Sequence, residues 1–144
     1  MLRLSNLADY AVLVMTTLAR ATPDSPMSAT QVAAASGVPL PTVAKLLGQL
    51  ARAGLLVSSR GVAGGFGLAR PAREISLADM VEAIDGPIAL THCAQGETDC
   101  DLAECCPVRP HWEPVNRAVR AALAEVALSE LVPVPAVALE GVPA

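Results

Sequence analysis

Aromatic residues are almost absent from this chain of 144 residues, which contains one Trp, one Tyr and one Phe. The hydrophobic content of 53% excludes a disordered chain, and its dominance by Ala, Leu and Val predicts an aliphatic core. Charged residues make up only 17% of the sequence, which is sparse for a monomer. We therefore expect one domain with an appendage, and some apolar surface buried against a partner.

The sequence also lacks the motifs of common enzymes. It has no recognisable Ser–His–Asp set, no phosphate-binding Gly-x-x-x-x-Gly-Lys-Ser/Thr loop and no pair of histidines spaced for zinc on a helix. The glycine-rich stretch Gly61–Gly67 lacks the strand-to-helix context of a dinucleotide site. These absences predict a protein that is not an enzyme.

The apolar run Leu2–Ala19 is too short to span a bilayer. It resembles a secretory signal in its length and in the charge of Arg3, but Asp9 interrupts it. We interpret this segment as a buried first helix and expect a cytoplasmic protein with no membrane contact. In that reducing compartment, thiols are free to bind metal.

Charge is divided unevenly between the two halves of the chain. Residues 1–75 carry seven Lys/Arg and three Asp/Glu, a net charge of +4. Residues 76–144 carry three Lys/Arg and eleven Asp/Glu, a net charge of −8, which completes the total of −4. A basic first half suits contact with phosphates, and an acidic second half does not.

Capping and turn residues predict a helix-turn-helix in the basic half. We expect helices from Ser5 to about Arg20, from Ala29 to about Ser36, and from Pro39 or Pro41 to Gly54. Two short helices joined by a glycine-containing turn are typical of this motif. Two strand-like runs within Leu55–Leu68 follow, around a glycine-rich tip, and predict a β-hairpin wing in which Gly64 and Gly65 supply positive φ angles.

Residues 1–75 are thus predicted to form a winged helix-turn-helix domain, and the fold class is mainly α with a small β wing. Residues 76–110 hold a connecting helix, begun by the capping box of Ser76 and Asp79, and a cysteine-rich loop. Residues 111–132 predict a long dimerisation helix with Pro114 in its first turn. One face of that helix is apolar and comprises Val115, Val119, Ala122, Leu123, Val126 and Leu131. Residues 133–144 are expected to be a disordered tail.

The polar face of the third helix supplies three candidate DNA-binding residues, Thr42, Lys45 and Gln49, because this helix of the motif enters the major groove. Lys45 suits a phosphate or a guanine, and Gln49 suits a base edge or the backbone. Ser28, at the start of the second helix, is a further candidate. Arg60 beside glycines is suited to a narrow minor groove. The alternative is a winged helix that serves only protein contacts.

All four cysteines lie in one polar segment, at Cys93, Cys100, Cys105 and Cys106. The spacing Cys93-x6-Cys100-x5-Cys106 is wider than the paired cysteines of structural zinc sites. It favours a loop that wraps an iron–sulfur cluster. Bound zinc and four unliganded thiols are the alternatives.

Three segments carry a family resemblance: the N-terminal Arg3-Leu-Ser with Ala8-Asp-Tyr-Ala-Val, the wing Ser59-Arg-Gly-Val-Ala-Gly-Gly-Phe66, and the three-cysteine loop ending in Cys106-Pro-Val-Arg-Pro-His-Trp112. Together they resemble the IscR/NsrR-type iron–sulfur winged-helix repressors over nearly the whole chain. Within that family, Cys-Asp-Leu-Ala…Cys-Pro-Val-Arg-Pro looks most like the SUF-system iron–sulfur assembly regulator. The resemblance implies a homodimeric bacterial transcription regulator with a [2Fe–2S] or [4Fe–4S] cluster that alters operator binding.

The resemblance also assigns residues. It places the DNA-contacting wing at Ser59, Arg60, Gly61, Gly64 and Gly65. It places the metal ligands at Cys93, Cys100 and Cys106, with Cys105 as an extra thiol that is an alternative.

The fourth ligand stays open. Arg109 stands where some relatives have a histidine ligand, and arginine does not bind iron. The candidates are Asp9 of the partner subunit, His111 and His92. Trp112 is expected either to cover the cluster or to anchor the long helix to the winged domain.

The sequence therefore predicts a cluster-dependent transcription regulator, expected to repress iron–sulfur assembly genes. Its partners are double-stranded DNA, as a pseudo-palindromic operator, and a second copy of the chain. One alternative is a nitric-oxide or redox-sensing repressor of the same family. The other is a zinc-stabilised interaction module that does not bind DNA.

Overall fold

The computed structural model describes residues 3–21, 25–91, 93, 100–102 and 104–132. The predicted fold class is confirmed, because the described chain is mainly α-helical with a two-stranded sheet. In chain order the elements are α1 (Asn6–Arg20), α2 (Ala29–Ser36), α3 (Leu40–Arg52), β1 (Leu56–Ser59), β2 (Gly65–Leu68), the 3-10 helix η1 (Ala72–Glu74), α4 (Leu77–Asp85), α5 (Arg109–Glu125) and α6 (Leu128–Leu131). His92 and the expected tail, residues 133–144, lie outside the described residues.

Side-chain caps begin the helices where the sequence predicts them. The Ser5 hydroxyl accepts a hydrogen bond from a first-turn backbone N–H of α1 at 3.0 Å. Ser28 and Gln31 form a reciprocal capping box ahead of α2, and Ser76 and Asp79 form another ahead of α4. Each cap pairs backbone donors that the first turn of a helix leaves without partners.

The core is aliphatic, as the composition predicts. Its largest fully buried members on α1 and α3 are Val14, Met15, Val43, Leu46, Leu47 and Leu50. Met80 of α4 and Leu128 of α6 are also fully buried in the same cluster. Burial of each such side chain contributes about 1.5–3 kcal/mol. The packing of the winged domain therefore continues beyond residue 75 into α4 and α6.

The predicted wing is confirmed, but its glycines have other roles than expected. β1 pairs antiparallel with β2 in a register that places Ser59 opposite Gly65. The tip between these residues closes with a hydrogen bond from the Gly64 N–H to the Gly61 carbonyl at 3.0 Å. The expectation of positive φ at Gly64 and Gly65 is wrong, because Gly61, with φ of 107°, holds that position. The tip is longer than a tight two-residue turn, which moves the left-handed residue to its start.

Gly65 instead permits the close approach of a third backbone segment. Met27 and Phe66 exchange two backbone hydrogen bonds, at 3.0 and 2.8 Å, so the residue before the α2 cap lies beside β2. A Cβ at Gly65 would lie 2.5 Å from the Met27 carbonyl carbon and oxygen. This contact holds the base of the wing against the start of α2.

The helix predicted over residues 111–132 is interrupted, since α5 and α6 are separate helices. Val126 and Leu131, which the prediction placed on one apolar face, are therefore not part of α5. Pro110 occupies the first turn of α5, and Pro114, expected there, lies inside the helix.

Backbone pairing explains the interruption. The Leu77 N–H donates to the Val126 carbonyl at 2.8 Å, and the Leu128 N–H donates to the Ile75 carbonyl at 2.7 Å. These two bonds hold the chain extended between α5 and α6, and they direct Leu128 into the core.

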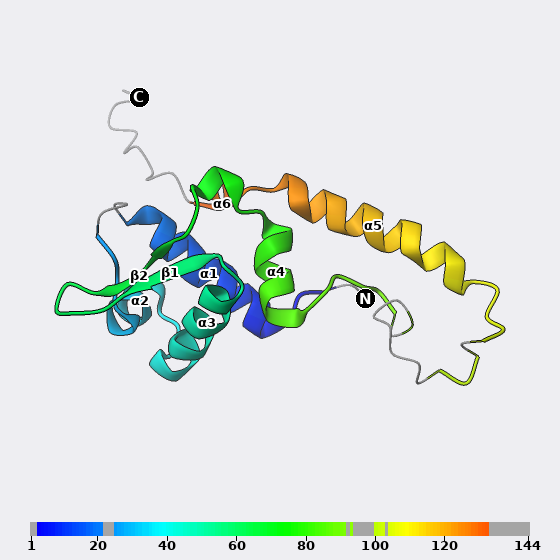
Figure 1. The fold of residues 1–144 in the computed structure, drawn as a ribbon, viewed down its shortest axis with the longest axis horizontal. Helices are drawn as coiled ribbons and strands as arrows, with labels where there is room; N and C mark the ends of the chain where they lie inside the picture. The colour runs from blue at the N-terminus through cyan, green and yellow to red at the C-terminus, as the bar shows by residue number, and fades with distance from the viewer. Residues whose placement is uncertain (1–2, 22–24, 92, 94–99, 103, 133–144) are drawn as a thin grey trace, which may run out of the picture.

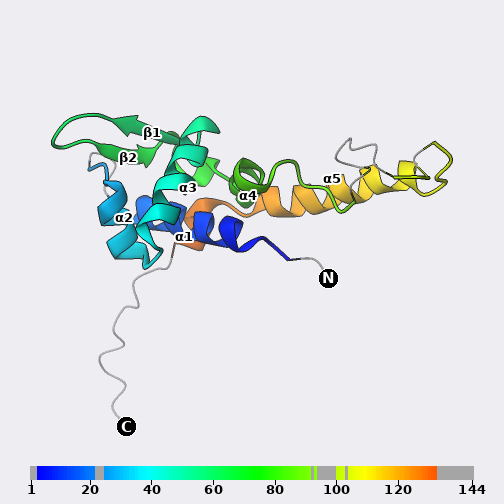
Figure 2. The ribbon, with the colours of Figure 1, turned by 90° about the horizontal axis from the view of Figure 1, so that it is seen from below.

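α5 extends away from the rest of the fold. Figures 1 and 2 show that the wing and the first turn of α5 lie at opposite ends of the molecule. No residue of α5 is buried within the described chain. None of the described helices has both the length and the apolar character needed to cross a membrane.

Candidate functional site

α3 is the second helix of the helix-turn-helix, and its polar face is open to solvent. The opposite face packs into the core through Val43, Leu46, Leu47 and Leu50. Thr42 lies in the first turn and is half-buried, while Lys45 lies one turn further on and is exposed. Both side chains belong to the half of α3 that enters a major groove in helix-turn-helix proteins.

Gln49, the third candidate on α3, sits at the edge of the buried face. It is half-buried, and its Oε1 atom is buried without a hydrogen-bond partner among the described residues. An amide oxygen in that position is costly and is not presented to a base edge. Thr42 and Lys45 are therefore better placed than Gln49 to contact DNA.

Ser28 uses its polar groups within the protein. Its hydroxyl accepts from the Gln31 N–H at 3.2 Å, and its own N–H donates to the Gln31 Oε1 at 2.8 Å. Its position next to Met27 places it between the wing and the start of α2. The geometry gives Ser28 a capping role.

The wing tip is exposed to solvent, and its backbone is tightly folded. The predicted DNA-contacting residues of the wing are Ser59, Arg60, Gly61, Gly64 and Gly65. The first three are exposed, and the two later glycines are half-buried. A Cβ at Gly64 would lie 2.4 Å from the Ser59 carbonyl oxygen, so glycine lets the tip fold tightly. Val62, which sequence reasoning did not single out, is the most exposed large apolar residue of the described chain, at 111%. Its position between Gly61 and Gly64 is the sequence feature that could have indicated an exposed side chain at the tip.

The helix-turn-helix and wing lack acidic side chains. Residues 25–70 contain no Asp or Glu, and their basic residues are Lys45, Arg52, Arg60 and Arg70. Three of these are exposed on α3 and the wing, and Arg70 lies 3.7 Å from the Asp79 carboxylate in an ion pair. A surface with positive charge and no negative charge attracts the phosphate backbone of DNA.

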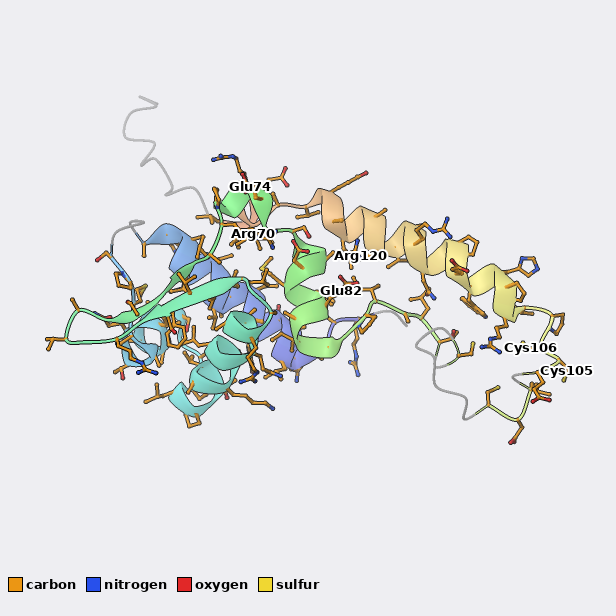
Figure 3. The ribbon with its side chains drawn as sticks, in the orientation of Figure 1. Arg70, Glu74, Glu82, Cys105, Cys106 and Arg120 are labelled. Atoms are coloured by element: carbon orange, nitrogen blue, oxygen red, sulfur yellow. The ribbon has the colours of Figure 1, made fainter. Side chains whose placement is uncertain are left out.

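The four cysteines are free thiols. Cys93 and Cys106 are half-buried, and Cys100 and Cys105 are exposed. Figure 3 shows Cys105 and Cys106 in the segment that leads into α5, at the end far from the wing. Among the described residues, no group of three or more His, Cys, Asp or Glu side chains is arranged to hold a metal ion. A single site formed by Cys93, Cys100 and Cys106 stays a prediction.

Cys93 lies beside a cavity of about 560 Å³ whose lining includes three arginines and one glutamate. The cavity lies between the segment after α4 and α5. Its lining comprises Ile88, Cys93, Arg109, Pro110, Glu113, Asn116, Arg117 and Arg120. An iron–sulfur cluster held by thiolates carries negative charge, which a guanidinium wall stabilises. Cys93 is the one thiol among the lining residues, so the described residues do not bring a full set of cluster ligands together at this cavity.

Hydrogen bonds from two helices hold the segment that leads to Cys93. The Asn116 side chain on α5 accepts from the Leu90 N–H at 2.9 Å. Arg120 on α5 donates to both carboxylate oxygens of Glu82 on α4, at 2.9 and 3.0 Å. Figure 3 shows these two side chains reaching toward each other between the helices. The hydrogen bonds and charge of Glu82 raise the pKa of Arg120, so the guanidinium stays charged.

The fourth-ligand candidates that the structure describes, Asp9 and His111, belong to the first turns of two different helices. Asp9 is exposed in the first turn of α1. His111 is exposed in the first turn of α5. Arg109 lines the cavity beside Cys93. His92 falls outside the described residues.

Trp112 is half-buried in the first turn of α5. Both of its expected roles, covering a cluster and anchoring the long helix, stay predictions.

The proteins to which this chain is similar include several transcription regulators. The chain is 29% identical over 131 residues, 91% of its length and 79% of the relative's, to the HTH-type transcriptional regulator IscR of Xenorhabdus nematophila. It is similar in structure to the global cysteine regulator CymR of B. subtilis, with a TM-score of 0.70 and 26% identity over 92% of this chain and 97% of that one. The IscR of T. potens superposes with a TM-score of 0.64 and 27% identity over 91% and 86% of the two chains.

These relatives are transcription regulators, which agrees with the prediction that the chain is not an enzyme. They also support the winged helix-turn-helix as a DNA-binding domain. A family profile described as "Iron-dependent Transcriptional regulator" matches residues 4–133, and the chain therefore belongs to the Rrf2 family of transcription regulators.

Proposed function

We propose that this Rrf2-family regulator binds an iron–sulfur cluster and that the cluster sets its affinity for operators of iron–sulfur assembly genes, which it represses. The observation that carries the proposal is the half-buried Cys93 beside a cavity lined by Arg109, Arg117 and Arg120. Free thiols supply the ligands that such clusters require, and guanidinium groups offset their negative charge. The protein acts in the cytoplasm, where reducing conditions keep those thiols available.

Cys93, Cys100 and Cys106 hold the cluster, and Asp9 of the partner subunit completes its ligands. When bound, a [2Fe–2S] or [4Fe–4S] cluster supplies one-electron redox chemistry and sensitivity to oxidants. Cys105 and His111 are the alternative ligands. The exposed position of Asp9 supports a role toward a second chain, because its carboxylate is open to solvent in the first turn of α1.

DNA binding rests on α3 and the wing. Thr42 and Lys45 contact the major groove, and Arg60 at the wing tip contacts the minor groove or its phosphates. The acid-free stretch of residues 25–70 supports this orientation. A dimer carries two such surfaces, which suits a pseudo-palindromic operator.

The dimer forms through α5. This helix has no buried residue in one chain, and Val115 on it is 42% exposed. An apolar groove of about 390 Å³ lies along α4 and α5, lined in part by Leu4, Val81, Val119 and Leu123. Tyr10 and Leu13 of α1 are exposed as well, at 40% and 44%. A second copy would bury these surfaces, as the low content of charged residues led us to expect.

Cluster and wing are coupled through the dimer. Cys105 and Cys106 lie at the far end of α5 from the wing of the same chain (Figure 3), so these two residues make no direct contact with it. A cluster that also engages the partner's α1 would set the relative orientation of the two DNA-binding domains. A coupling free energy of about 1–3 kcal/mol changes operator occupancy by roughly 5- to 150-fold.

Anaerobic purification tests the cluster. We expect a brown protein with visible absorbance and near-stoichiometric iron and sulfide. The variant with serine at Cys93, Cys100 and Cys106 should lose all three signals, and Cys105→Ser should retain them as the matched control. Asp9→Ala should hasten cluster loss. A colourless parent protein with tightly bound zinc would contradict the proposal.

Footprinting with loaded and stripped protein side by side tests the coupling. We expect protection of a two-fold operator to differ between the two forms by at least fivefold in protein concentration. Equal protection would leave a DNA-binding protein whose cluster, if present, has no regulatory effect.

A thiol-based redox-sensing repressor of the same family is the second candidate. The exposed, free thiols of Cys100 and Cys105 favour it, together with the similarity to a cysteine regulator. Mild oxidation of cluster-free protein should then alter operator affinity, and reduction by dithiothreitol should restore it. No response of the cluster-free protein would exclude this candidate.

A further inference from the structure

Val62, at the tip of the wing, is an apolar side chain that nothing in the described chain covers. It is 111% exposed, whereas the next most exposed large apolar residue, Leu102, is 61% exposed. A valine held in water forgoes the free energy that its burial would contribute. Val62 therefore adds no packing to the folded chain, and its whole apolar surface is open to a binding partner.

The backbone of the tip fixes the position of Val62. The Gly64 N–H donates to the Gly61 carbonyl at 3.0 Å, so Val62 and Ala63 are the central residues of a closed turn. Gly61 enters this turn with φ of 107°. Valine is branched at Cβ, which restricts its side-chain rotation. Figures 1 and 2 show this tip projecting away from the helices, so Val62 is a stiff apolar group at the end of the hairpin.

The charge around Val62 favours DNA as its partner. Arg60 is exposed two residues earlier, and residues 25–70 contain no Asp or Glu. A guanidinium suits the negative potential of a narrow minor groove. That groove is about 6 Å wide, and its walls are the C–H edges of the deoxyribose rings. Apolar side chains enter it in several classes of DNA-binding protein. A cation beside a small apolar group therefore matches both the charge and the walls of the groove.

We propose that Val62 enters the minor groove together with Arg60 and packs its methyl groups against the deoxyribose walls. This inference rests on the proposed function, in which the wing contacts DNA, and it adds a residue that contributes affinity without neutralising a phosphate. Such a contact releases no counterions, so it does not weaken with salt as phosphate contacts do. It is most favourable in a narrow, A·T-rich groove, where both walls lie close to the side chain.

Three variants isolate this contact. Val62→Ala removes two methyl groups, and Val62→Ile adds one carbon while it keeps the branch at Cβ. Val57→Ala is the matched control, because Val57 is an exposed valine of the same hairpin, on β1 and outside the tip. Thermal unfolding checks that all three variants fold, as expected for positions that are not buried.

Two measurements on the operator fragment mapped by footprinting follow. Gel-shift titration at several salt concentrations gives the affinity and its salt dependence. Hydroxyl-radical footprinting reports contact with the sugars, because the radical attacks deoxyribose hydrogens that line the minor groove.

We expect Val62→Ala to bind the operator about 5- to 10-fold more weakly with the salt dependence of the parent, because apolar burial is lost and no phosphate contact is. Protection of the minor-groove sugars should weaken in the same variant. Val62→Ile and Val57→Ala should match the parent in both measurements.

Three results would overturn the proposal. The first is a Val62→Ala variant with the affinity and sugar protection of the parent. The second is an equal loss in Val57→Ala, which would assign the effect to the hairpin as a whole. The third is a reduced salt dependence in Val62→Ala, which would assign the loss to a displaced Arg60. A parent protein that binds no duplex DNA would instead contradict the proposed function itself, a result distinct from these three.

Discussion

Arg60 places a guanidinium at the tip of the wing. It is exposed, it follows Ser59 at the end of β1, and it precedes the left-handed Gly61. Residues 25–70 contain no acidic side chain that would compete with DNA for it. At the scale of single residues, this charge is the clearest candidate contact between the wing and DNA.

Replacing Arg60 with alanine should weaken operator binding by about 1–3 kcal/mol, because a charged contact to DNA is lost. The measurement is a gel-shift titration at two salt concentrations, and the salt dependence should fall as well. Arg73→Ala is the control, since Arg73 is exposed on η1 and lies 3.7 Å from Glu74 in an ion pair. Unchanged operator affinity in the Arg60 variant would show that this residue of the wing does not contact DNA.

At the scale of elements, two contacts between distant segments position the parts of the fold. One is the pairing of Met27 with Phe66, which attaches β2 to the start of α2. The other is the pair of hydrogen bonds between Arg120 and Glu82, which attaches α5 to α4. The first orients the wing, and the second holds the helix that carries the cysteine segment.

Gly65→Ala should destabilise the protein by about 1–3 kcal/mol, because its Cβ would overlap the Met27 backbone. Gly67→Ala is the matched control in the same strand, since a Cβ there meets no atom within 4 Å. Denaturant unfolding of both variants gives the difference in free energy. Equal free energies of unfolding in the two variants would mean that the Met27 backbone can shift away from β2 without loss of stability.

Arg120→Ala should loosen α5 and the segment before Cys93, because the contact with Glu82 joins these parts. Hydrogen exchange of α5 and of residues 88–91 should become faster than in Arg117→Ala, whose ion pair with Glu113 stays within α5. A raised pKa means that this contribution is fully present below arginine's ordinary pKa and is lost only at strongly alkaline pH. Equal protection of α5 and residues 88–91 in the parent and in the Arg120 variant, measured at the same pH, would contradict this role.

At the scale of the whole molecule, the long dimension comes from α5. The wing lies at one end, and Cys105, Cys106 and the first turn of α5 lie at the other (Figure 3). The apolar side of α5 is only partly covered within one described chain, because Val119 and Leu123 are half-buried and Val115 is exposed. This division is consistent with the low content of charged residues and with the proposed pairing of two copies through α5.

Val119→Glu should convert the dimer to a monomer, because it places a charge in the apolar groove beside α4. Ala121→Glu, at an exposed position on the same helix, should leave the dimer intact. Sedimentation velocity on cluster-free protein measures the difference. Thermal unfolding should show that the winged domain still folds, since no residue of α5 belongs to its core. A Val119 variant that remains dimeric would show that the dimer interface does not include this groove.

Local and periodic features of the sequence were sufficient to predict much of this molecule. Capping residues act on the backbone next to them, so Ser5, Ser28 and Ser76 marked the helix starts correctly. Apolar residues at helical spacing identified the buried side of α3. The grouping of four thiols in one segment is also a property of the chain alone.

Tertiary structure decided what depends on segments far apart in the chain. Backbone bonds from Ile75 and Leu77 ended α5 and turned Leu128 into the core. The approach of Met27 explained Gly65, and packing at the edge of α3 buried the Gln49 oxygen. Helix periodicity and capping rules contain no information on such contacts, because their geometry exists only once the distant segments have packed together.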